Sequence, residues 1–587
     1  MMDTPNSLIP SKKPVRLSAA AAISLPRWGI LLLCLIYILP GLIGRDPWKN
    51  NDAADFGTMW TMAEGTFNDW LWPNVMGLPT AESGPLTFWI GAICIKLFGG
   101  VLGAPIAARI ATILFFLLGA SSIWKTANLL GQRADAQPMH LAFGGQPDTT
   151  AYGRMLADSA LLIYLGSLGL LIYSHETSVN ALFVALIAYV MYRCTRYINL
   201  PSVKNACMLG VVFALLVLTN GFIVPVGLYF CLIVGIFFIH PPRRRHFRNL
   251  IIAFIISIWI IAIWWSLLEL IQPYGSSPYD EWINWNMGQI TWPSLQTLSI
   301  FAKKSVWFFW PAWPFACWAI YAWRHQWKTA AHVIMPLLFT VTFIILALFS
   351  SLNDDTNLLT FIPPLSVLAA LGLPTMKRGA INAIDWFSIM ALTLIALFIW
   401  IAWCARHTGW PTSIARNAIK LAPGFVPELN IPVTVIAFCT TLAWLALVYW
   451  RISRRPSVLM RAVVLSSGGI MHCWILLATL WMPWINYNKS YAGIAHEMAQ
   501  QMPEKLSCIS SNTTPAQRAS FAFFGQVRFE KFGHESCAYQ LIKDRVPKRH
   551  RPKSPKMYDG RYLIWEGHRP SDREERFRLY YLKEPQR

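Results

Sequence analysis

Acidic residues near the amino terminus are the first candidates for chemistry, because acids are scarce in this chain. Its 587 residues contain 29 Asp and Glu against 50 Lys and Arg. Asp52 and Asp55 are three positions apart and share one face if their segment is helical. Such a pair can provide a general base and a ligand for a metal ion or for sugar hydroxyls. An ordinary solvated loop would carry similar charges, so both interpretations stay open. The same stretch holds four further acids: Asp46, Glu64, Asp69 and Glu82.

Cationic and acidic residues further along the chain could join such a site. Lys303 and Lys304 precede an aromatic run at 307–314. Cations at the mouth of an aromatic-lined groove suit a lipid phosphate, whose chain would lie against the rings. Lysines and tryptophans also commonly anchor a helix end at a membrane interface, and this alternative stays open. Three more acidic points are His175-Glu176, Asp280-Glu281 and Asn353-Asp354-Asp355.

The elements that must position these residues are membrane helices. The chain is 55% hydrophobic and only 13% charged, whereas ordinary globular proteins are about 25% charged. Apolar stretches of about 17–25 residues with few charges predict spanning helices. Such stretches lie at 26–44, 85–103, 106–124, 157–174, 179–195, 205–219, 221–240, 249–271, 305–323, 330–350, 358–375, 384–403, 431–450 and 460–481.

Basic loops orient these helices, because cytoplasmic loops collect Lys and Arg. Loops at 243–248, 324–328, 377–378 and 451–461 fall on one side, and they account for much of the net charge of +21. We therefore expect no nucleic-acid partner. The pattern predicts a multi-pass protein of a bacterial inner membrane, with its N-terminus in the cytoplasm and its C-terminus and acidic points in the periplasm. This topology needs an odd number of spans, so we expect about 13 helices, with 85–103 not crossing fully.

The chain divides into three predicted parts. Residues 1–25 form a cytoplasmic segment, 26–485 a membrane domain whose first loop is 45–84, and 486–587 a small periplasmic α/β domain. Apolar residues at helical spacing from Phe56 to Ala63 predict an amphipathic helix along the membrane interface. The tail pattern predicts strands at 506–509, 527–532, 537–542, 562–565 and 577–582, and a helix at 514–524. Cys508 and Cys537 would pair in an oxidising periplasm, or else remain buried thiols.

Several familiar signatures are missing from the sequence. There is no P-loop, no zinc spacing of Cys and His, and no G-x-S-x-G elbow. An ATP-driven pump is therefore not expected. Ionisable residues gather at helix ends, whereas secondary transporters usually place polar groups near the middle of the membrane.

Motifs in the first loop carry a resemblance to a known family. Residues 46–53 read D-P-W-K-N-N-D-A, residues 68–73 read N-D-W-L-W-P, and residues 77–89 read G-L-P-T-A-E-S-G-P-L-T-F-W. Together they resemble bacterial glycosyltransferases of the protein O-mannosyltransferase superfamily, which includes the lipid A aminoarabinose transferase. The resemblance in motif covers about residues 45–110. It implies the GT-C fold, with about 13 membrane helices and a small periplasmic domain at the C-terminus.

The resemblance also implies roles for individual residues. Asp52 matches the family's key acid, and Asp55 is the fallback because the family's acidic pair is not intact here. Glu82 matches the Glu of the family's E-K-P-P motif, but Ser83 replaces the Lys that would contact phosphate. Lys303 or Lys304 would then substitute for that Lys. His175 and Glu176 match a second polar external loop that binds substrate.

The reaction implied by the resemblance transfers a sugar from a polyprenyl phosphate to a cell-envelope acceptor, which is lipid A, another glycan or a protein. The acceptor attacks the anomeric carbon with Asp52 as base or orienting partner. Lys or a divalent cation (Mg, Mn or Zn) stabilises the departing phosphate. Two other classes stay open. A polytopic transporter or lipid flippase would show charges in mid-helix, and a non-catalytic membrane relative would explain the broken acidic pair and Ser83.

Overall fold

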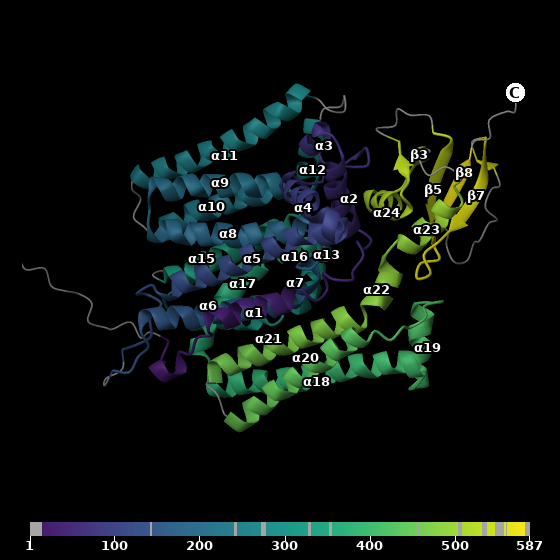
Figure 1. Cartoon of the computed structure of the whole chain (residues 1–587). Coiled ribbons are helices and arrows are strands. Elements are labelled where there is room, and N and C mark those ends of the chain that lie inside the picture. The colour runs from purple at the N-terminus through teal and green to yellow at the C-terminus, as the bar shows by residue number, and fades with distance from the viewer. Residues whose placement is uncertain are drawn as a thin grey trace, which may run out of the picture.

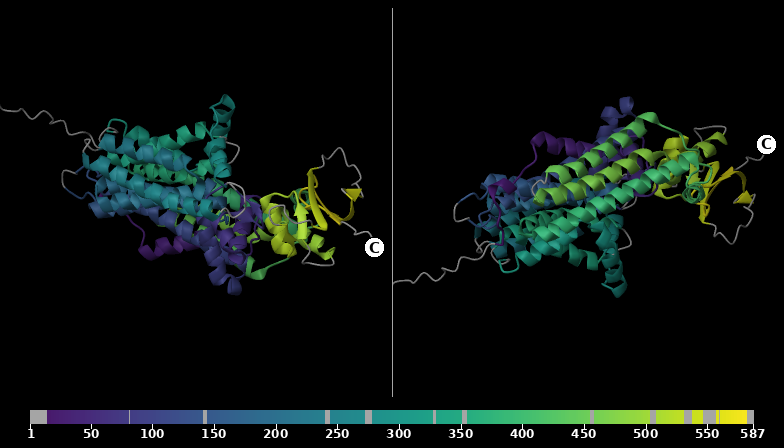
Figure 2. Two further views of the ribbon diagram at one scale, coloured as in Figure 1. Left: turned by 90° about the horizontal axis from the view of Figure 1, so that it is seen from above. Right: turned by 90° about the horizontal axis from the view of Figure 1, so that it is seen from below.

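The chain forms a bundle of helices with a small sheet at one end (Figure 1). The computed structural model describes residues 14–80, 82–140, 144–239, 244–271, 278–326, 330–350, 355–454, 458–502, 508–530, 537–545, 557–558 and 560–581. We call the end that carries the sheet the sheet end of the bundle. The first described residues lie at the opposite end (Figures 1 and 2).

Apolar helices of varied length make up the body of the bundle. They are α1 (Arg27–Ile38), α4 (Leu86–Leu102), α5 (Ala104–Gly131), α6 (Thr149–Leu165), α7 (Leu168–Tyr173), α8 (Val179–Asn199), α9 (Val203–Asn220), α10 (Ile223–Ile239), α11 (Arg244–Ile271), α14 (Ala312–Ala322), α15 (Ala331–Leu348), α17 (Ile362–Gly372), α18 (Arg378–Thr408), α20 (Ile431–Arg454) and α21 (Val458–Leu480). The last three, α18, α20 and α21, form a layer along one flank (Figure 2).

Further helices and two short strands connect the helices of the bundle. They are η1 (Ala19–Ala21), α2 (Asn51–Glu64), α3 (Phe67–Leu71), β1 (Asn74–Val75), β2 (Leu78–Pro79), α12 (Pro278–Gly288), α13 (Leu295–Phe308), α16 (Thr356–Leu359), η2 (Leu373–Thr375), α19 (Thr412–Leu421), α22 (Met482–Lys489) and α23 (Ala492–Gln500). Strands β1 and β2 pair as an antiparallel hairpin inside the first loop.

All fourteen apolar stretches contain helix, which confirms the predicted polytopic α-helical class. Within the described part of the chain, nine helices are long and apolar enough to cross a membrane by length and composition. The sequence predicts about 13, and the difference has a physical source. Helices α1, α4 and α10 are apolar but short, and two further stretches are interrupted, between α6 and α7 and between α13 and α14.

Helix α4 is the segment that the sequence expects not to cross fully, and its two ends support that expectation. Just before α4, the Gly84 N–H donates to the Thr219 carbonyl at the sheet end of α9. Just after α4, Arg109 near the start of α5 donates to the Leu42 carbonyl beyond the end of α1, 2.9 Å away. Both ends of α4 therefore lie at the sheet end, so α4 does not cross to the opposite end of the bundle.

The C-terminal residues form an α/β unit, as the sequence pattern predicts. Its elements are β3 (Cys508–Ser511), α24 (Pro515–Gly525), β4 (Arg528–Phe529), β5 (Tyr539–Arg545), β6 (Met557–Tyr558), β7 (Arg561–Gly567) and β8 (Glu575–Tyr581). The strand order is β4-β3-β5-β8-β7-β6, and β3 runs parallel to both β4 and β5. Thr514 and Gln517 form a capping box that starts α24, with Pro515 in its first turn. Predicted strand residues 506–507, 531–532 and 582 lie outside the described residues.

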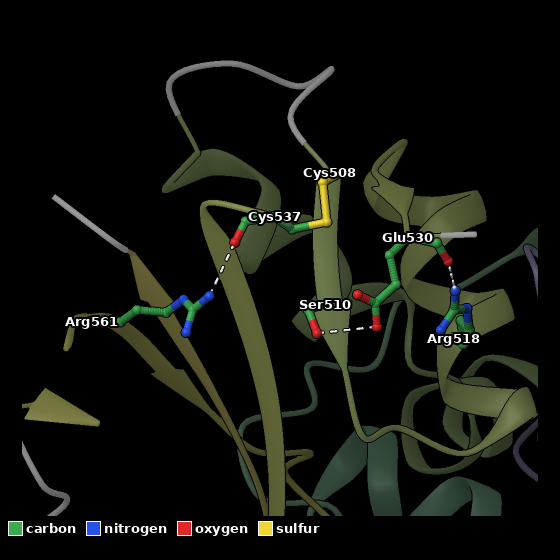
Figure 3. The surroundings of a disulfide bond; sticks show 6 residues. All are labelled: Cys508, Ser510, Arg518, Glu530, Cys537 and Arg561. Atoms are coloured by element: carbon green, nitrogen blue, oxygen red, sulfur yellow. Dashed lines mark hydrogen bonds between the residues drawn. A yellow bond between two sulfur atoms is a disulfide. The ribbon is translucent and has the colours of Figure 1, made fainter. Parts of the chain in front are cut away.

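A disulfide joins Cys508 to Cys537, with a Cα–Cα distance of 5.2 Å (Figure 3). It links β3 to the residues that lead into β5. The Cys537 carbonyl also accepts a hydrogen bond from Arg561 of β7, 3.3 Å away (Figure 3). The disulfide ties the start of β3 to the segment before β5, and the Arg561 hydrogen bond ties that segment to β7.

Replacing both bridged cysteines by serine should destabilise the C-terminal unit. The bridge closes a loop of 29 residues, and a loop of that length corresponds to about 3–4 kcal/mol in the chain-entropy account. The measurement is urea unfolding of the full chain in detergent, with the unfolding of the C-terminal unit detected by its proteolysis. Cys317→Ser is the control, because Cys317 is an exposed free cysteine. Equal midpoints for the double variant and the control would contradict the prediction.

Candidate active site

A polar cavity of about 670 Å³ opens where the first loop meets the helix bundle. Its walls come from α2, the residues before α4, the start of α8, the end of α9, α12 and α16. In a chain with so few polar residues, this concentration is the mark of a binding site. The polar lining residues are Asn51, Asp55, Thr58, Thr80, Glu82, Ser83, Asn180, Asn220, Gln289, Ser350, Thr356 and Asn357.

Helix α2 carries the acidic residues of the cavity, and it is held firmly between α4 and α24. Gly57 lies against Ala519 of α24, and a Cβ at position 57 would come within 2.3 Å of the Ala519 side chain. Phe56 and Met59 are buried in a cluster with Phe88 of α4. The helix predicted for the first loop is therefore present. Its apolar face is covered by protein, however, and not by the membrane interface that the sequence analysis expected.

Asp55 is the carboxylate of α2 that faces the cavity. One of its oxygens accepts a hydrogen bond from the Val179 N–H, 2.8 Å away, at the first turn of α8. Burial raises the pKa of Asp55 to about 8, and the nearby charges of Asp52, Glu176 and Glu82 act in the same direction. The Val179 hydrogen bond opposes this shift only in part. Asp55 therefore takes and gives a proton near neutral pH, as a general base must.

Asp52 lies one turn earlier and is not among the lining residues of the cavity. It is 2% exposed, and its Oδ2 is 2.8 Å from Nη2 of Arg45, which is 3% exposed. The N–H groups of Trp48 and Thr177 donate to the two carboxylate oxygens at 2.9 and 2.7 Å. Asp52 is thus occupied in a buried ion pair that fixes the start of α2. From the sequence we expect Asp52 to be the key acid and Asp55 the fallback, whereas the geometry favours the reverse order.

His175 and Glu176 belong to the same buried network rather than to the cavity wall. The His175 carbonyl accepts from Arg45 at 3.1 Å, and Glu176 lies 3.8 Å from the same guanidinium. Burial lowers the pKa of His175 to about 4, so its ring is neutral at physiological pH. Trp48 stacks on Arg45, with the guanidinium 3.6 Å from the ring centroid. Direct substrate contacts by His175 and Glu176 therefore find no support in the geometry of the described cavity.

The two lysines of α13 do not line the cavity. Lys304 pairs with Asp355 at 2.6 Å, next to the lining residue Thr356, and Lys303 is exposed. No Lys or Arg is present among the described lining residues. Asp280 and Glu281 are exposed on α12, outside the lining set, and the acidic point at 353–354 lies outside the described residues.

Glu82 and Ser83 of the sequence motif line the cavity. Three amides that the sequence motifs do not single out, Asn180, Asn220 and Gln289, also line the cavity. A signal was available, because Asn180 and Asn220 are isolated polar residues at the ends of apolar stretches. Amides in such places need hydrogen-bond partners, and here they face a polar cavity.

A metal site held by the chain is not found in the described residues, where no group of three or more His, Cys, Asp or Glu side chains is arranged to hold an ion. The divalent cation named in the sequence analysis stays a prediction. The cavity's own hydroxyl and amide groups are the donors that the described structure offers to an anion.

An apolar cavity of about 190 Å³ adjoins the polar one. It lies between α10 and α15 and is lined by side chains that include Val224, Phe343 and Leu346. The two cavities share Gln289 and two further residues, Ser350 and Asn357. A ligand with a polar head and an apolar chain would find both surfaces in one place.

Comparison with known proteins identifies the fold. No protein-family model matches the chain, and no curated protein matches it. Among the solved structures that match, two cover 95% of this chain and 99% of their own. ArnT from Cupriavidus metallidurans bound to undecaprenyl phosphate has a TM-score of 0.66 at 14% identity. The apo form of the same protein has a TM-score of 0.64 at 15% identity. The chain is therefore a multi-pass membrane protein with the fold of ArnT, which confirms the predicted GT-C architecture with its small C-terminal sheet.

Proposed function

We propose that this protein is a membrane glycosyltransferase that moves a sugar from a polyprenyl phosphate to an acceptor in the cell envelope. The observation that carries the proposal is Asp55, a carboxylate with a raised pKa in a polar cavity that adjoins an apolar one. The fold adds support, because the ArnT that it resembles has been solved with undecaprenyl phosphate bound. A nucleotide-binding loop is not needed for a lipid-linked donor, and the sequence has no P-loop.

The donor would span both cavities. Its isoprene units would lie against Phe343 and Leu346 between α10 and α15, and its phosphate and sugar would enter the polar cavity. Ser83 and Gln289 are placed to donate hydrogen bonds to phosphate oxygens, which partly replaces the Lys of the family motif. Lys304 remains a candidate for long-range charge stabilisation from its position beside Asp355.

The proposed reaction is a single displacement at the anomeric carbon of the sugar. The acceptor hydroxyl or phosphate gives its proton to Asp55, or is oriented by it, and its oxygen attacks that carbon. The bond between the anomeric carbon and the phosphate oxygen breaks, and polyprenyl phosphate leaves with the electron pair. Hydrogen-bond donors of the cavity stabilise the charge on the departing phosphate.

The proposed location is the periplasmic side of a bacterial inner membrane. The cavity lies at the sheet end, and the positive-inside rule places the basic loops at the opposite end, with the N-terminus, in the cytoplasm. The C-terminal sheet and its disulfide would then lie in the periplasm, where thiols are oxidised. The acceptor would be the outward-facing part of lipid A, another envelope glycan or an exported protein.

Transfer can be tested directly in proteoliposomes. The purified chain would be supplied with undecaprenyl-phosphate sugars labelled in the sugar, together with envelope lipids, glycans and peptides as acceptors. Formation of a labelled acceptor with release of undecaprenyl phosphate supports the proposal. A lipid flippase would move the labelled lipid between leaflets without forming a new glycosidic bond. Tight undecaprenyl phosphate binding without transfer from a broad donor panel would support a non-catalytic relative and contradict the proposal.

The rate of transfer should depend on pH through Asp55. Because the base acts in its ionised form, kcat/KM should rise with pH and level off above the raised pKa of about 8. An unperturbed Asp, with a pKa near 3.9, would leave the rate flat across this range. The measurement is the initial rate between pH 6 and 9.5 at low donor concentration. A flat profile over this range would argue against Asp55 as the base.

A further inference from the structure

A second cavity of about 670 Å³ lies between the first loop and the C-terminal unit. Its walls come from a different face of α2, the turn of the β1–β2 hairpin, α23 and the segment from α24 to β4. It shares no described lining residue with the first cavity. In Figure 1, α23 and α24 stand beside the sheet, beyond the ends of the long apolar helices, and both contribute to the walls of this cavity.

A row of aromatic rings forms one wall of this second cavity. The ring centroids of Trp60 and Phe523 are 5.2 Å apart, as are those of Phe523 and Phe524, and both pairs meet edge to face with their planes at 88° and 78°. The ring of His496 extends the row, 6.1 Å from Phe524. The side chains of Trp60, Phe523 and Phe524 are only half-buried, so part of each ring is open to a ligand. Exposed rings in a concave site outside the membrane call for a ligand with apolar faces.

Polar side chains stand at the edge of the aromatic wall. Glu64, His496 and Gln526 are exposed and line the same cavity. A carboxylate accepts two hydrogen bonds and an amide both donates and accepts, so each can bind a pair of neighbouring hydroxyls. The ligand that fits has apolar faces and polar edges.

Backbone strain is concentrated around this cavity. Met76 and Gln526 both have positive φ angles, +48° and +50°. They are two of the three non-glycine residues with positive φ in the described part of the chain. Such conformations cost free energy and persist where the surrounding structure holds them, commonly at ligand sites. The strained positions place Gln526 at the end of α24 and Met76 at the tip of the hairpin, facing the same space.

We propose that this second cavity binds a short pyranose oligosaccharide, at a site separate from the transfer cavity. The C–H face of one pyranose ring lies on the open part of the Trp60 ring, neighbouring sugar units contact Phe523 and Phe524, and the ring hydroxyls bond to Glu64 and Gln526. Along α2, Glu64 is nine residues from Asp55, or about 13 Å at 1.5 Å per residue. The site therefore holds a glycan without using the residues proposed for catalysis.

Binding can be measured on the full chain in detergent, without any polyprenyl donor. The probes are chitobiose, maltotriose and a β-1,6-linked glucosamine disaccharide. Saturation-transfer NMR and calorimetry measure the binding of each probe. At least one probe should bind saturably, and Glu64→Gln and Trp60→Leu should each weaken it about tenfold, near the value of one good polar or aromatic contact. Glu497→Gln, an exposed acid on α23 outside the cavity, should bind like the parent. Asp55→Asn should also bind like the parent.

Two outcomes would overturn the proposal. One is the absence of saturable binding by every probe up to tens of millimolar. The other is unchanged affinity in both Glu64→Gln and Trp60→Leu. Glu64 is exposed, so Glu64→Gln keeps the comparison valid even if Trp60→Leu lowers the melting temperature. Glycan binding is measured without a polyprenyl donor and should be unchanged in Asp55→Asn. The binding result can therefore be interpreted even if the protein does not transfer sugar.

Discussion

Asp55→Asn should lower the transfer rate about 10²- to 10⁴-fold, the range that a positioned general base contributes. The amide keeps the size of the side chain and can still accept the hydrogen bond from the Val179 N–H. It cannot take a proton from the acceptor. The loss should therefore appear mainly in kcat, with donor binding little changed, and it is measured by single-turnover transfer in proteoliposomes.

The pH dependence of folding stability is an independent check on the same variant. The raised pKa of Asp55 determines whether stability rises or falls with pH. Below about pH 4 the carboxyl is protonated in both the folded and unfolded states. Between about pH 4 and 8 the unfolded chain releases this proton and the folded chain keeps it, so the contribution to stability falls as pH rises. Above about pH 8 both states are ionised and the penalty is constant. Asp55→Asn should thus be at least as stable as the parent, and its relative stability should grow across this window.

Asp280→Asn is the matched control for the Asp55 prediction. Asp280 is an exposed acid on α12 and does not line the cavity. Its amide variant should transfer sugar at the parental rate. An equal loss of rate in the two variants would show that the effect comes from general electrostatics at this face. Full transfer activity in Asp55→Asn would remove Asp55 from the mechanism.

Much of the fold follows from the sequence because hydrophobic length is a strong signal. Every apolar stretch holds helix, and the charge of Lys96 together with the Gly99-Gly100 pair already marks 85–103 as an unusual segment. The contacts that hold both ends of α4 at the sheet end could not be derived from the sequence, because they join residues far apart in the chain. Arg109 reaches the Leu42 carbonyl across 67 positions, and no periodicity encodes such a pairing.

The candidate site was less predictable than the fold. The sequence places Asp52 and Asp55 on one face of a helix, and nothing local distinguishes them. The distinction comes from Arg45, an ordinary loop charge in the sequence, and from the Thr177 N–H, 125 positions away. Lys304 illustrates the same limit. Its spacing from the aromatic run indicated a phosphate ligand, whereas the folded chain pairs it with Asp355.

Arg45→Met should be among the most destabilising single changes in the molecule, at about 3–5 kcal/mol in the free energy of unfolding. Removing the guanidinium leaves the Asp52 carboxylate buried, with the backbone N–H groups of Trp48 and Thr177 as its remaining donors among the described residues. It also removes the hydrogen bond to the His175 carbonyl and the stacking on Trp48. The start of α2 would then move, and transfer should fall because Asp55 is one turn away.

A double-mutant cycle separates the ion pair from the rest of this network. Asp52→Asn alone leaves Arg45 buried with the longer contact to Glu176, 3.8 Å away, so it should also cost several kcal/mol. Arg45→Met with Asp52→Asn removes both charges, and the amide oxygen still accepts one backbone N–H. The double variant should therefore be clearly less destabilised than the sum of the two single variants. Additive losses would mean that the two charges do not interact in the folded protein.

Lys304→Met is the matched control for this cycle, since it removes one cation from an ion pair at a similar distance. The Lys304 and Asp355 side chains are 38% and 45% exposed, against 0% and 1% for Arg45 and Asp52. Water already solvates the exposed pair, so its loss should change stability by less than about 1 kcal/mol. Chemical unfolding in mixed micelles would compare the variants. A loss at Arg45 no larger than the loss at Lys304 would show that burial of the first pair does not hold α2 in place.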